Sequence, residues 1–202
     1  MFSGTASFSK VAEERGHSIF TVDSDPGHNS TVTADLRYCI TSGLPQEPTF
    51  LWASPPCTGF SVASIGKHWN TDRSPKTDTA RLGIELFLIT IRIIRETRPT
   101  YWIIENPRGM ARTLPFLKQF RRVTVTYCQY GDLRMKPTDL WTNIPESVWI
   151  PRPTCKNGDP CHVSAPRGSR TGTQGIKGAK NRGVVPPDLI TEILERIEAD
   201  IE

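Results

Sequence analysis

Short apolar runs alternate with longer amphipathic stretches along the chain, and this alternation predicts strands followed by helices. The clearest helix covers residues 81–98, which are apolar on most sides and end at Pro99. Further helices are expected at residues 8–15, 110–121 and 188–201, and strands at residues 17–22, 31–36, 48–54, 100–104, 122–129 and around Leu140. Repeating strand–helix units predict an α/β fold, with a mostly parallel sheet and helices on both faces.

Composition limits the class of protein. The 202 residues, 37% hydrophobic and 23% charged, predict a soluble globular domain. No apolar run is long enough to span a membrane, and the amino terminus lacks the basic and apolar segments of a secretory signal. We therefore expect a cytoplasmic monomer. Five cysteines are an odd number, and without export a disulfide framework is not expected.

A cysteine stands where one buried strand is forced to end. The strand at residues 48–54 meets Pro55 and Pro56, which cannot continue a hydrogen-bond ladder, and Cys57 follows at once. Small polar residues then continue the chain, as a loop over a site would need. In an open α/β sheet, such a position faces the crevice where ligands bind. A nucleophile and a buried structural thiol both remain open for Cys57 on this stretch alone.

Two other expected strands also end in polar groups. Asp23 follows the strand at residues 17–22, behind a glycine-containing turn and a helix, and Glu105-Asn106 follows the strand at residues 100–104. Nucleotide-binding units begin with a glycine-containing turn, followed by a helix and then a strand that ends in an acidic residue. The signal is weak alone, because acids also end strands in ordinary turns. In a parallel sheet all three ends would lie at one edge.

The order of these motifs resembles the cytosine-5 DNA methyltransferase family over almost the whole chain. Pro56-Cys57 is similar to the family's Pro-Cys turn, and Glu105-Asn106 to its Glu-Asn pair. Gln129, Arg134 and Lys136 look like its Gln-x-Arg-x-Arg motif, although two extra residues separate Gln129 from Arg134. Gly183 begins a stretch that resembles the closing motif.

The resemblance implies a Rossmann-like methyltransferase fold, S-adenosylmethionine as cofactor and DNA as partner. It places cofactor binding on Phe2, Ser3, Gly4, Thr5, Asp23, Ser24, Asp35, Leu36, Pro55 and Val184. It places catalysis on Cys57, Glu105, Arg134 and Lys136. It places substrate binding on Ser54, Pro56, Ser61, Asn106 and Pro107. Arg167 and Arg170, in a run of glycines, hydroxyl residues and arginines, are expected from their residue types to bind phosphates of the substrate.

The implied chemistry explains these residue types. Cytosine C5 becomes nucleophilic once a thiolate has added to C6, which is covalent catalysis by Cys57. Nearby positive charge is expected to lower the pKa of that thiol. Glu105 would hydrogen-bond to N3, and either Arg134 or Lys136 would hold O2. The target base must lie outside a duplex, flipped or single-stranded.

The chain departs from the family most clearly between the Gln/Arg motif and the closing motif. There the family has a large target-recognition domain, whereas this chain has only the basic, loop-rich insert 146–181. We expect a catalytic domain at 1–145, that insert, and a closing motif and helix at 182–202. A minimal, phage-type enzyme with relaxed sequence preference is expected. RNA or a free cytidine nucleotide as substrate, and a non-catalytic DNA-binding scaffold, remain alternatives.

The insert also contains a candidate metal site. Cys155, Cys161 and His162 carry the donor types that zinc prefers. Their spacing matches no standard site, and a fourth ligand is missing unless His68, Cys128 or water supplies it. A loop with ordinary cysteines is the default interpretation, so no metal is expected.

Overall fold

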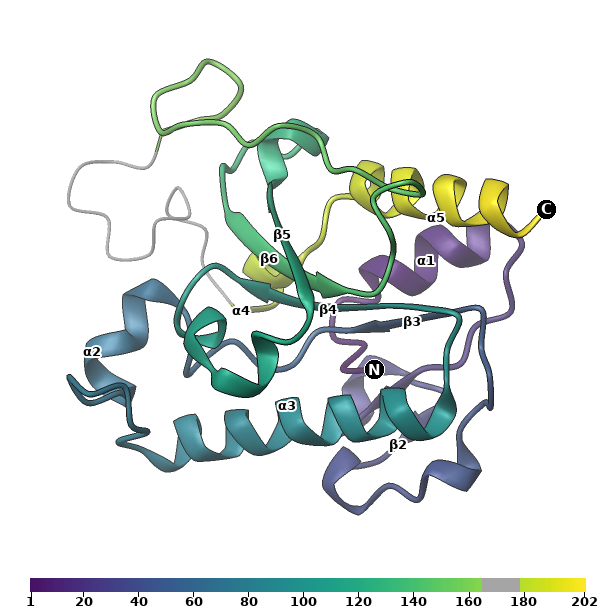
Figure 1. The fold of residues 1–202 in the computed structure, drawn as a ribbon, viewed down its shortest axis with the longest axis horizontal. Coiled ribbons are helices and arrows are strands. Elements are labelled where there is room, and N and C mark those ends of the chain that lie inside the picture. Colours follow the sequence, from purple (N-terminus) through teal and green to yellow (C-terminus); the bar gives the residue numbers. More distant parts are fainter. Residues whose placement is uncertain (165–178) are drawn as a thin grey trace.

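The computed structural model describes residues 1–164 and 179–202, and its strands lie between two layers of helices (Figure 1). The main sheet has the strand order β3-β4-β6-β5. Its strands are Phe50–Ala53 (β3), Tyr101–Pro107 (β4), Arg121–Thr126 (β5) and Pro137–Thr142 (β6). A smaller parallel sheet pairs Val22–Asp23 (β1) with Val32–Thr33 (β2).

The first two residues connect the two sheets. The amide of Phe2 donates to the carbonyl oxygen of Val22 at 2.9 Å, and the carbonyl oxygen of Met1 accepts from the amide of Ser54 at 3.3 Å. Residues 1 and 2 therefore take a strand-like place between β1 and the end of β3.

Strand direction in the main sheet follows the prediction, with one exception. β3 pairs with β4 in parallel, while β6 is antiparallel to both β4 and β5. β3, β4 and β5 thus share one direction and only β6 opposes them, so the sheet is mixed. The ten-residue connection 127–136 explains the exception, because a parallel crossover needs about a dozen residues or more.

Helices cover both faces of this sheet, as predicted. Asp78–Thr97 (α3) lies along one face, and Ser7–Glu14 (α1) and Pro187–Ile201 (α5) lie together on the other (Figure 1). Alternate residues of β4 serve the two layers: Trp102 and Ile104 pack with α3, whereas Ile103 packs with α1 and α5. All five residues from Trp102 to Asn106 are buried, as a strand covered by helices on both faces requires.

The remaining helices are short. Two are α-helical, Ile65–His68 (α2) and Ala179–Gly183 (α4). The others are 3₁₀ helices at Pro26–His28, Leu36–Tyr38, Thr41–Gly43, Val62–Ser64, Met110–Thr113, Pro115–Leu117 and Tyr127–Tyr130. None of the helices in the described part of the chain has the length and apolar character that a bilayer crossing would require.

Four predicted elements differ from the structure. The strand expected at residues 31–36 is only Val32–Thr33, and a 3₁₀ helix begins at Leu36. The strand expected at residues 122–129 ends at Thr126, where a 3₁₀ helix follows. The helix expected at residues 110–121 is wrong: two 3₁₀ turns stand there, and β5 already begins at Arg121. Pro115, which has no N–H to donate, starts the second turn and prevents a continuous helix. Of the strand expected at residues 17–22, only Val22 belongs to a strand in the structure, because pairing with the short strand β2 begins at Val22.

Candidate active site

The edge of the sheet at which β3 and β4 end is also the edge at which β6 begins. Pro107, the last residue of β4, lies opposite Thr138, the second residue of β6. The loop after β3 and the residues just before β6 therefore meet around Glu105 and Asn106. The antiparallel direction of β6 is what brings Lys136 to this edge.

The turn that carries Cys57 is fixed from both sides. The side-chain amide of Asn106 donates to the carbonyl oxygen of Pro55 at 2.8 Å, within the protein interior. The carbonyl oxygen of Cys57 accepts from the amides of Phe60 at 2.9 Å and Ser61 at 3.1 Å. Phe60 itself is fully buried. Asn106, expected to bind substrate, thus acts in the structure as a support for the cysteine turn.

A cavity of about 1030 Å³ opens beside this turn. Most of the predicted site residues line it: Phe2, Ser3, Gly4, Thr5, Ser54, Pro55, Pro56, Cys57, Ser61, Glu105, Pro107 and Lys136. Arg108 and Arg182 line it too, although the sequence analysis assigned neither to the site. Both are basic residues next to motif residues, which is the only sequence signal that could have found them.

The expected lowering of the pKa of Cys57 is wrong. Cys57 is exposed at the cavity, yet nearby protein atoms displace part of the water around its thiol, and this desolvation raises its pKa; the negative charge of Glu105 adds to the rise. The positive charges of Lys136 and Arg182 oppose it without reversing it. The surroundings of Cys57 therefore favour the thiol over the thiolate.

Glu105 is buried and held by a residue that the sequence analysis did not single out. The hydroxyl of Tyr127 donates to its Oε1 at 3.2 Å. Burial, together with the charge of Glu105, raises the pKa of Tyr127 well above its ordinary value, so its hydroxyl stays a donor. In the sequence, Tyr127 is the last apolar residue of the alternating pattern Val123, Val125, Tyr127, and this position could have indicated that its side chain is buried.

The structure separates the roles of Arg134 and Lys136. Arg134 is buried, pairs with Asp132 and donates to the carbonyl oxygens of Asn181 and Val184. It lies outside the cavity lining and ties the closing motif to β6. Lys136 lines the cavity, with its ammonium 4.4 Å from the centre of the Tyr127 ring and 2.8 Å from the carbonyl oxygen of Arg182. Lys136 is thus the better placed cation.

Asp23 organises the glycine turn instead of lining the cavity. Its Oδ2 accepts from the amide of Gly4 at 3.0 Å, and its Oδ1 accepts from the amide of Asp25 at 2.9 Å. Burial alone would raise the pKa of Asp23, but these amides and His28 outweigh it and leave the pKa lowered. Gly4 has a left-handed φ of +45°, which a residue without a side chain adopts most readily.

Other predicted residues lie apart from the cavity. Asp35 caps a 3₁₀ helix and pairs with Arg37 at 2.6 Å, while Leu36 is buried in a separate apolar cluster. Ser24 is exposed. Val184 is exposed and contributes its carbonyl oxygen to Arg134. Arg167 and Arg170 lie outside the described residues.

The candidate metal residues do come together, and the fourth donor is a cysteine. Ligand atoms of Cys128, Cys155, Cys161 and His162 all lie within 4.8 Å of one another. His68, the other candidate, instead pairs its Nδ1 with the hydroxyl of Thr77 at 2.7 Å. Gln129 belongs to this cluster and not to the cavity, since its amide donates to Cys161 Sγ at 3.4 Å.

The fold is that of a methyltransferase. A crystal structure from E. coli, titled "putative DNA modification methyltransferase encoded within prophage Cp", superimposes with a TM-score of 0.51 at 16% sequence identity. The match covers 81% of this chain and 55% of that one. At this identity the likeness concerns the fold alone.

The family follows from the sequence comparisons. A protein of Frog virus 3 (isolate Goorha), named "Probable DNA (cytosine-5)-methyltransferase", is 34% identical over 96% of this chain and 97% of its own length. The model of the family "C-5 cytosine-specific DNA methylase" matches residues 25–121. The Streptomyces achromogenes "Type II methyltransferase M.SacI" is 26% identical over 45% of this chain and 23% of its own length. The chain belongs to the cytosine-5 DNA methyltransferase family.

Proposed function

We propose that this chain transfers a methyl group from S-adenosylmethionine to C5 of cytosine in DNA, through a covalent bond between Cys57 Sγ and C6 of the base. The observation that carries the proposal is that Cys57, Glu105 and Lys136 line one cavity. The same cavity continues to the turn at Ser3, Gly4 and Thr5. A nucleophile, a hydrogen-bonding carboxyl group and a cation are thus combined with room for a cofactor.

The residues divide the reaction between them. The Cys57 thiolate adds to C6, and the displaced electron pair makes C5 nucleophilic. Glu105 hydrogen-bonds to N3, and the Lys136 ammonium lies where it can hold O2, so both stabilise the charge that develops on the ring. After C5 has taken the methyl group from the sulfonium sulfur, which is left as a neutral thioether, a base removes the C5 proton and the electron pair of that bond expels the Cys57 thiolate from C6. The thiol and the cavity are then ready for another base.

The cavity suits S-adenosylmethionine, which when bound supplies a methyl group on a positively charged sulfur. A volume of about 1030 Å³ lies at the upper end of the range for ligand pockets, so it has room for a cofactor beside a base. The glycine turn at residues 3–5 lines the cavity, and Asp23 fixes its shape by accepting a hydrogen bond from the Gly4 amide. We assign cofactor contacts to Phe2, Ser3, Thr5 and Pro55.

DNA is the proposed substrate because the matched family and the Frog virus 3 relative carry that substrate in their names. A cytosine inside a duplex could not reach Cys57, so the base must be flipped or single-stranded. Arg108, exposed at the cavity wall, suits a backbone phosphate next to such a base. RNA or a free cytidine nucleotide would use the same chemistry.

Transfer of a labelled methyl group tests the substrate. The protein is incubated with labelled S-adenosylmethionine and, separately, with duplex DNA, single-stranded DNA, RNA and cytidine nucleotides. We expect label at cytosine C5 in DNA, lost in Cys57→Ala and kept in Cys39→Ala, because Cys39 lies outside the cavity lining. Label in RNA or nucleotide but not in DNA would contradict the substrate. Bisulfite sequencing of DNA from expressing cells would then give the sequence context.

A further inference from the structure

We propose that Cys128, Cys155, Cys161 and His162 form a structural zinc site. Three thiols and one imidazole nitrogen converge there, with all four ligand atoms within 4.8 Å of one another. Soft sulfur donors with an imidazole favour zinc over the oxygen-binding cations. Four protein ligands would close the coordination sphere, which is typical of a structural site and not of a catalytic one.

The separations between donors fit a tetrahedral ion. With Zn–S at about 2.3 Å and Zn–N at about 2.0–2.1 Å, neighbouring sulfurs lie about 3.8 Å apart and sulfur and nitrogen about 3.5 Å apart. Cys128 and Cys161 sulfurs are 3.6 Å apart, and His162 Nδ1 is 3.5 Å from Cys161 and 3.8 Å from Cys155. The Cys128–Cys155 pair, at 3.1 Å, is the one that an ion would widen.

The chain builds the site from two segments. Cys128 lies in the 3₁₀ helix directly after β5, and is buried with Cys155. Between Cys155 and Cys161 the chain turns back on itself: the amide of Asp159 donates to the carbonyl oxygen of Lys156, and Gly158 has a φ of +97°. This reversal returns the second thiol and the imidazole to the first.

Backbone contacts on both sides of the loop fix it against the sheet. The amide of Cys155 donates to the hydroxyl of Thr126 at 3.1 Å, and the amide of Val163 donates to the carbonyl oxygen of Leu133 at 2.9 Å. The donors are therefore held near one another before an ion arrives.

A metal would explain how this segment keeps its place. Residues 143–164 contain no helix or strand within the described part of the chain. Small loop-rich segments gain order from a metal that crosslinks distant residues. Here the crosslink would join the insert to the segment next to Tyr127, whose hydroxyl contacts Glu105. The site would thus brace one wall of the cavity.

Metal analysis of the intact chain tests the proposal. We expect about one zinc ion per chain after purification without added metal, as a closed four-ligand site implies. Replacement by Co²⁺ should give the strong visible absorption of a tetrahedral ion and a sulfur-to-cobalt charge-transfer band. Cys161→Ser and His162→Ala should lose bound zinc and the charge-transfer intensity should fall, while Cys39→Ser, a cysteine outside the cluster, should keep both.

The proposal would be overturned by wild-type protein that holds no stoichiometric zinc and gives no tetrahedral cobalt spectrum. It would also be overturned by a Cys128–Cys155 disulfide in the intact protein, or by zinc that persists equally in both cluster variants. These readouts do not depend on methyl transfer, so they stand apart from the proposed enzymatic function. Because the wild-type zinc content is measured directly, a variant that fails to fold does not obscure the result.

Discussion

Charges of both signs act on the Cys57 thiol, and the largest are those of Glu105 and Lys136. Glu105 raises its pKa together with burial, and Lys136 lowers it. The pKa of the Cys57 thiol therefore lies above that of an ordinary cysteine, and a higher pH is needed to convert half of it to the thiolate. Because the two charges shift the pKa of Cys57 in opposite directions, removing each one separately tests both contributions.

We predict that alkylation of Cys57 by iodoacetamide, followed by mass spectrometry of its peptide, accelerates with pH to a midpoint above that of an ordinary cysteine. Glu105→Gln should speed alkylation at a fixed pH, because it removes the negative charge that disfavours the thiolate. Lys136→Met should slow it. A midpoint below that of an ordinary cysteine, or shifts of both variants in the same direction, would contradict this electrostatic account.

Asn106 should matter through the turn that it supports. In Asn106→Ala the buried carbonyl oxygen of Pro55 loses its donor, so urea unfolding should show a loss of about 1–3 kcal/mol. The methyl transfer rate should fall as well, since Cys57 follows in the same turn. Gln119→Ala is the matched control, because Gln119 also donates to a carbonyl oxygen but at the exposed surface. Equal losses in both variants would refute the supporting role.

At the residue scale, the sequence analysis predicted side chains that the structure brings to one cavity, but it did not predict their surroundings. Cys57 and Glu105 could be found because prolines and polar residues interrupt apolar runs. The direction predicted for the pKa of Cys57 is wrong, because a sequence shows which charges exist but not how much water the neighbouring protein atoms displace from a thiol. Lys136 and Arg134 could not be told apart, because only the structure reveals that Arg134 is paired with Asp132.

At the scale of elements, the loop after Cys57 is anchored on α3 through Phe60. The Phe60 ring meets the rings of Phe87 and Trp69, at 5.2 and 5.5 Å between centroids. Gly83 of α3 leaves the space in which this ring lies, since a Cβ there would be 2.3 Å from Phe60 Cε2. The position of the cysteine loop thus depends on a glycine in the middle of a helix.

We predict that Gly83→Ala costs about 1–3 kcal/mol of unfolding free energy through overpacking, set against the ~1 kcal/mol that alanine contributes in a helix. Relative to an alanine substitution at an uncrowded helical glycine, it should therefore be less stable by about 1–3 kcal/mol. Gly66→Ala in α2 is the control, because its added Cβ meets open space. Urea unfolding of both variants makes the comparison. If Gly83→Ala were as stable as Gly66→Ala, Phe60 would not be held as described.

Elements with strong periodicity were predicted well, and the others were not. α3, with its apolar surface and Pro99 behind it, lies close to its predicted place, as does α5. The direction of β6 could not be read from its residues, because it follows from the short connection 127–136. The segment 110–121 combined apolar residues with Pro115, and its 3₁₀ turns depend on tertiary contacts that the pattern does not contain.

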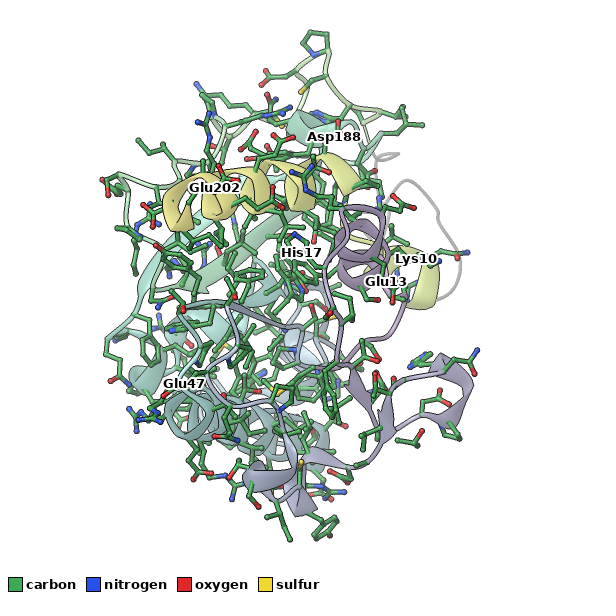
Figure 2. The ribbon with its side chains drawn as sticks, turned by 90° about the vertical axis from the view of Figure 1, so that its right-hand side faces the viewer. Lys10, Glu13, His17, Glu47, Asp188 and Glu202 are labelled. Carbon is green, nitrogen blue, oxygen red and sulfur yellow. The ribbon has the colours of Figure 1, made fainter. Side chains whose placement is uncertain are left out.

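On the scale of the whole molecule, α1 and α5 join distant parts of the chain. Arg15 and His17, just after α1, both contact Glu198 of α5, at 2.5 and 2.7 Å. Figure 2 shows His17 beside the α5 helix, on the face that it shares with α1. The pKa of Glu198 is lowered from 4.5 to about 2, chiefly by its hydrogen bonds with Arg15.

Glu198→Gln should therefore destabilise the protein in a pH-dependent way. A lowered pKa in the folded state means that the stabilisation is present above about pH 4.5 and is lost as the pH falls towards 2. At pH 7 we expect a loss of roughly 0.2–1 kcal/mol, since the pair is partly exposed. Glu195→Gln, whose contact with Arg15 is 3.4 Å long, should lose less. Chemical unfolding at several pH values would contradict the account if the difference did not shrink in acid.

The order of motifs along the whole chain was the most informative property of the sequence. Strand ends at Asp23, Cys57 and Glu105 are each ambiguous alone, but their order resembles the family that the comparisons establish. The cysteine cluster was harder to predict. Strand β6 and an irregular segment separate Cys128 from Cys155 in the sequence. The two thiols come together only because β6 folds back against β5.

The most direct test of the central claim is trapping of the covalent intermediate. DNA that carries 5-fluorocytosine has no proton at C5 for a base to remove, so the bond between enzyme and base should persist. In the presence of S-adenosylmethionine we predict a denaturation-resistant protein–DNA complex, with the modification on the Cys57 peptide and no complex in Cys57→Ala. Methyl transfer to ordinary DNA without any trapped complex, or trapping that survives Cys57→Ala, would contradict it.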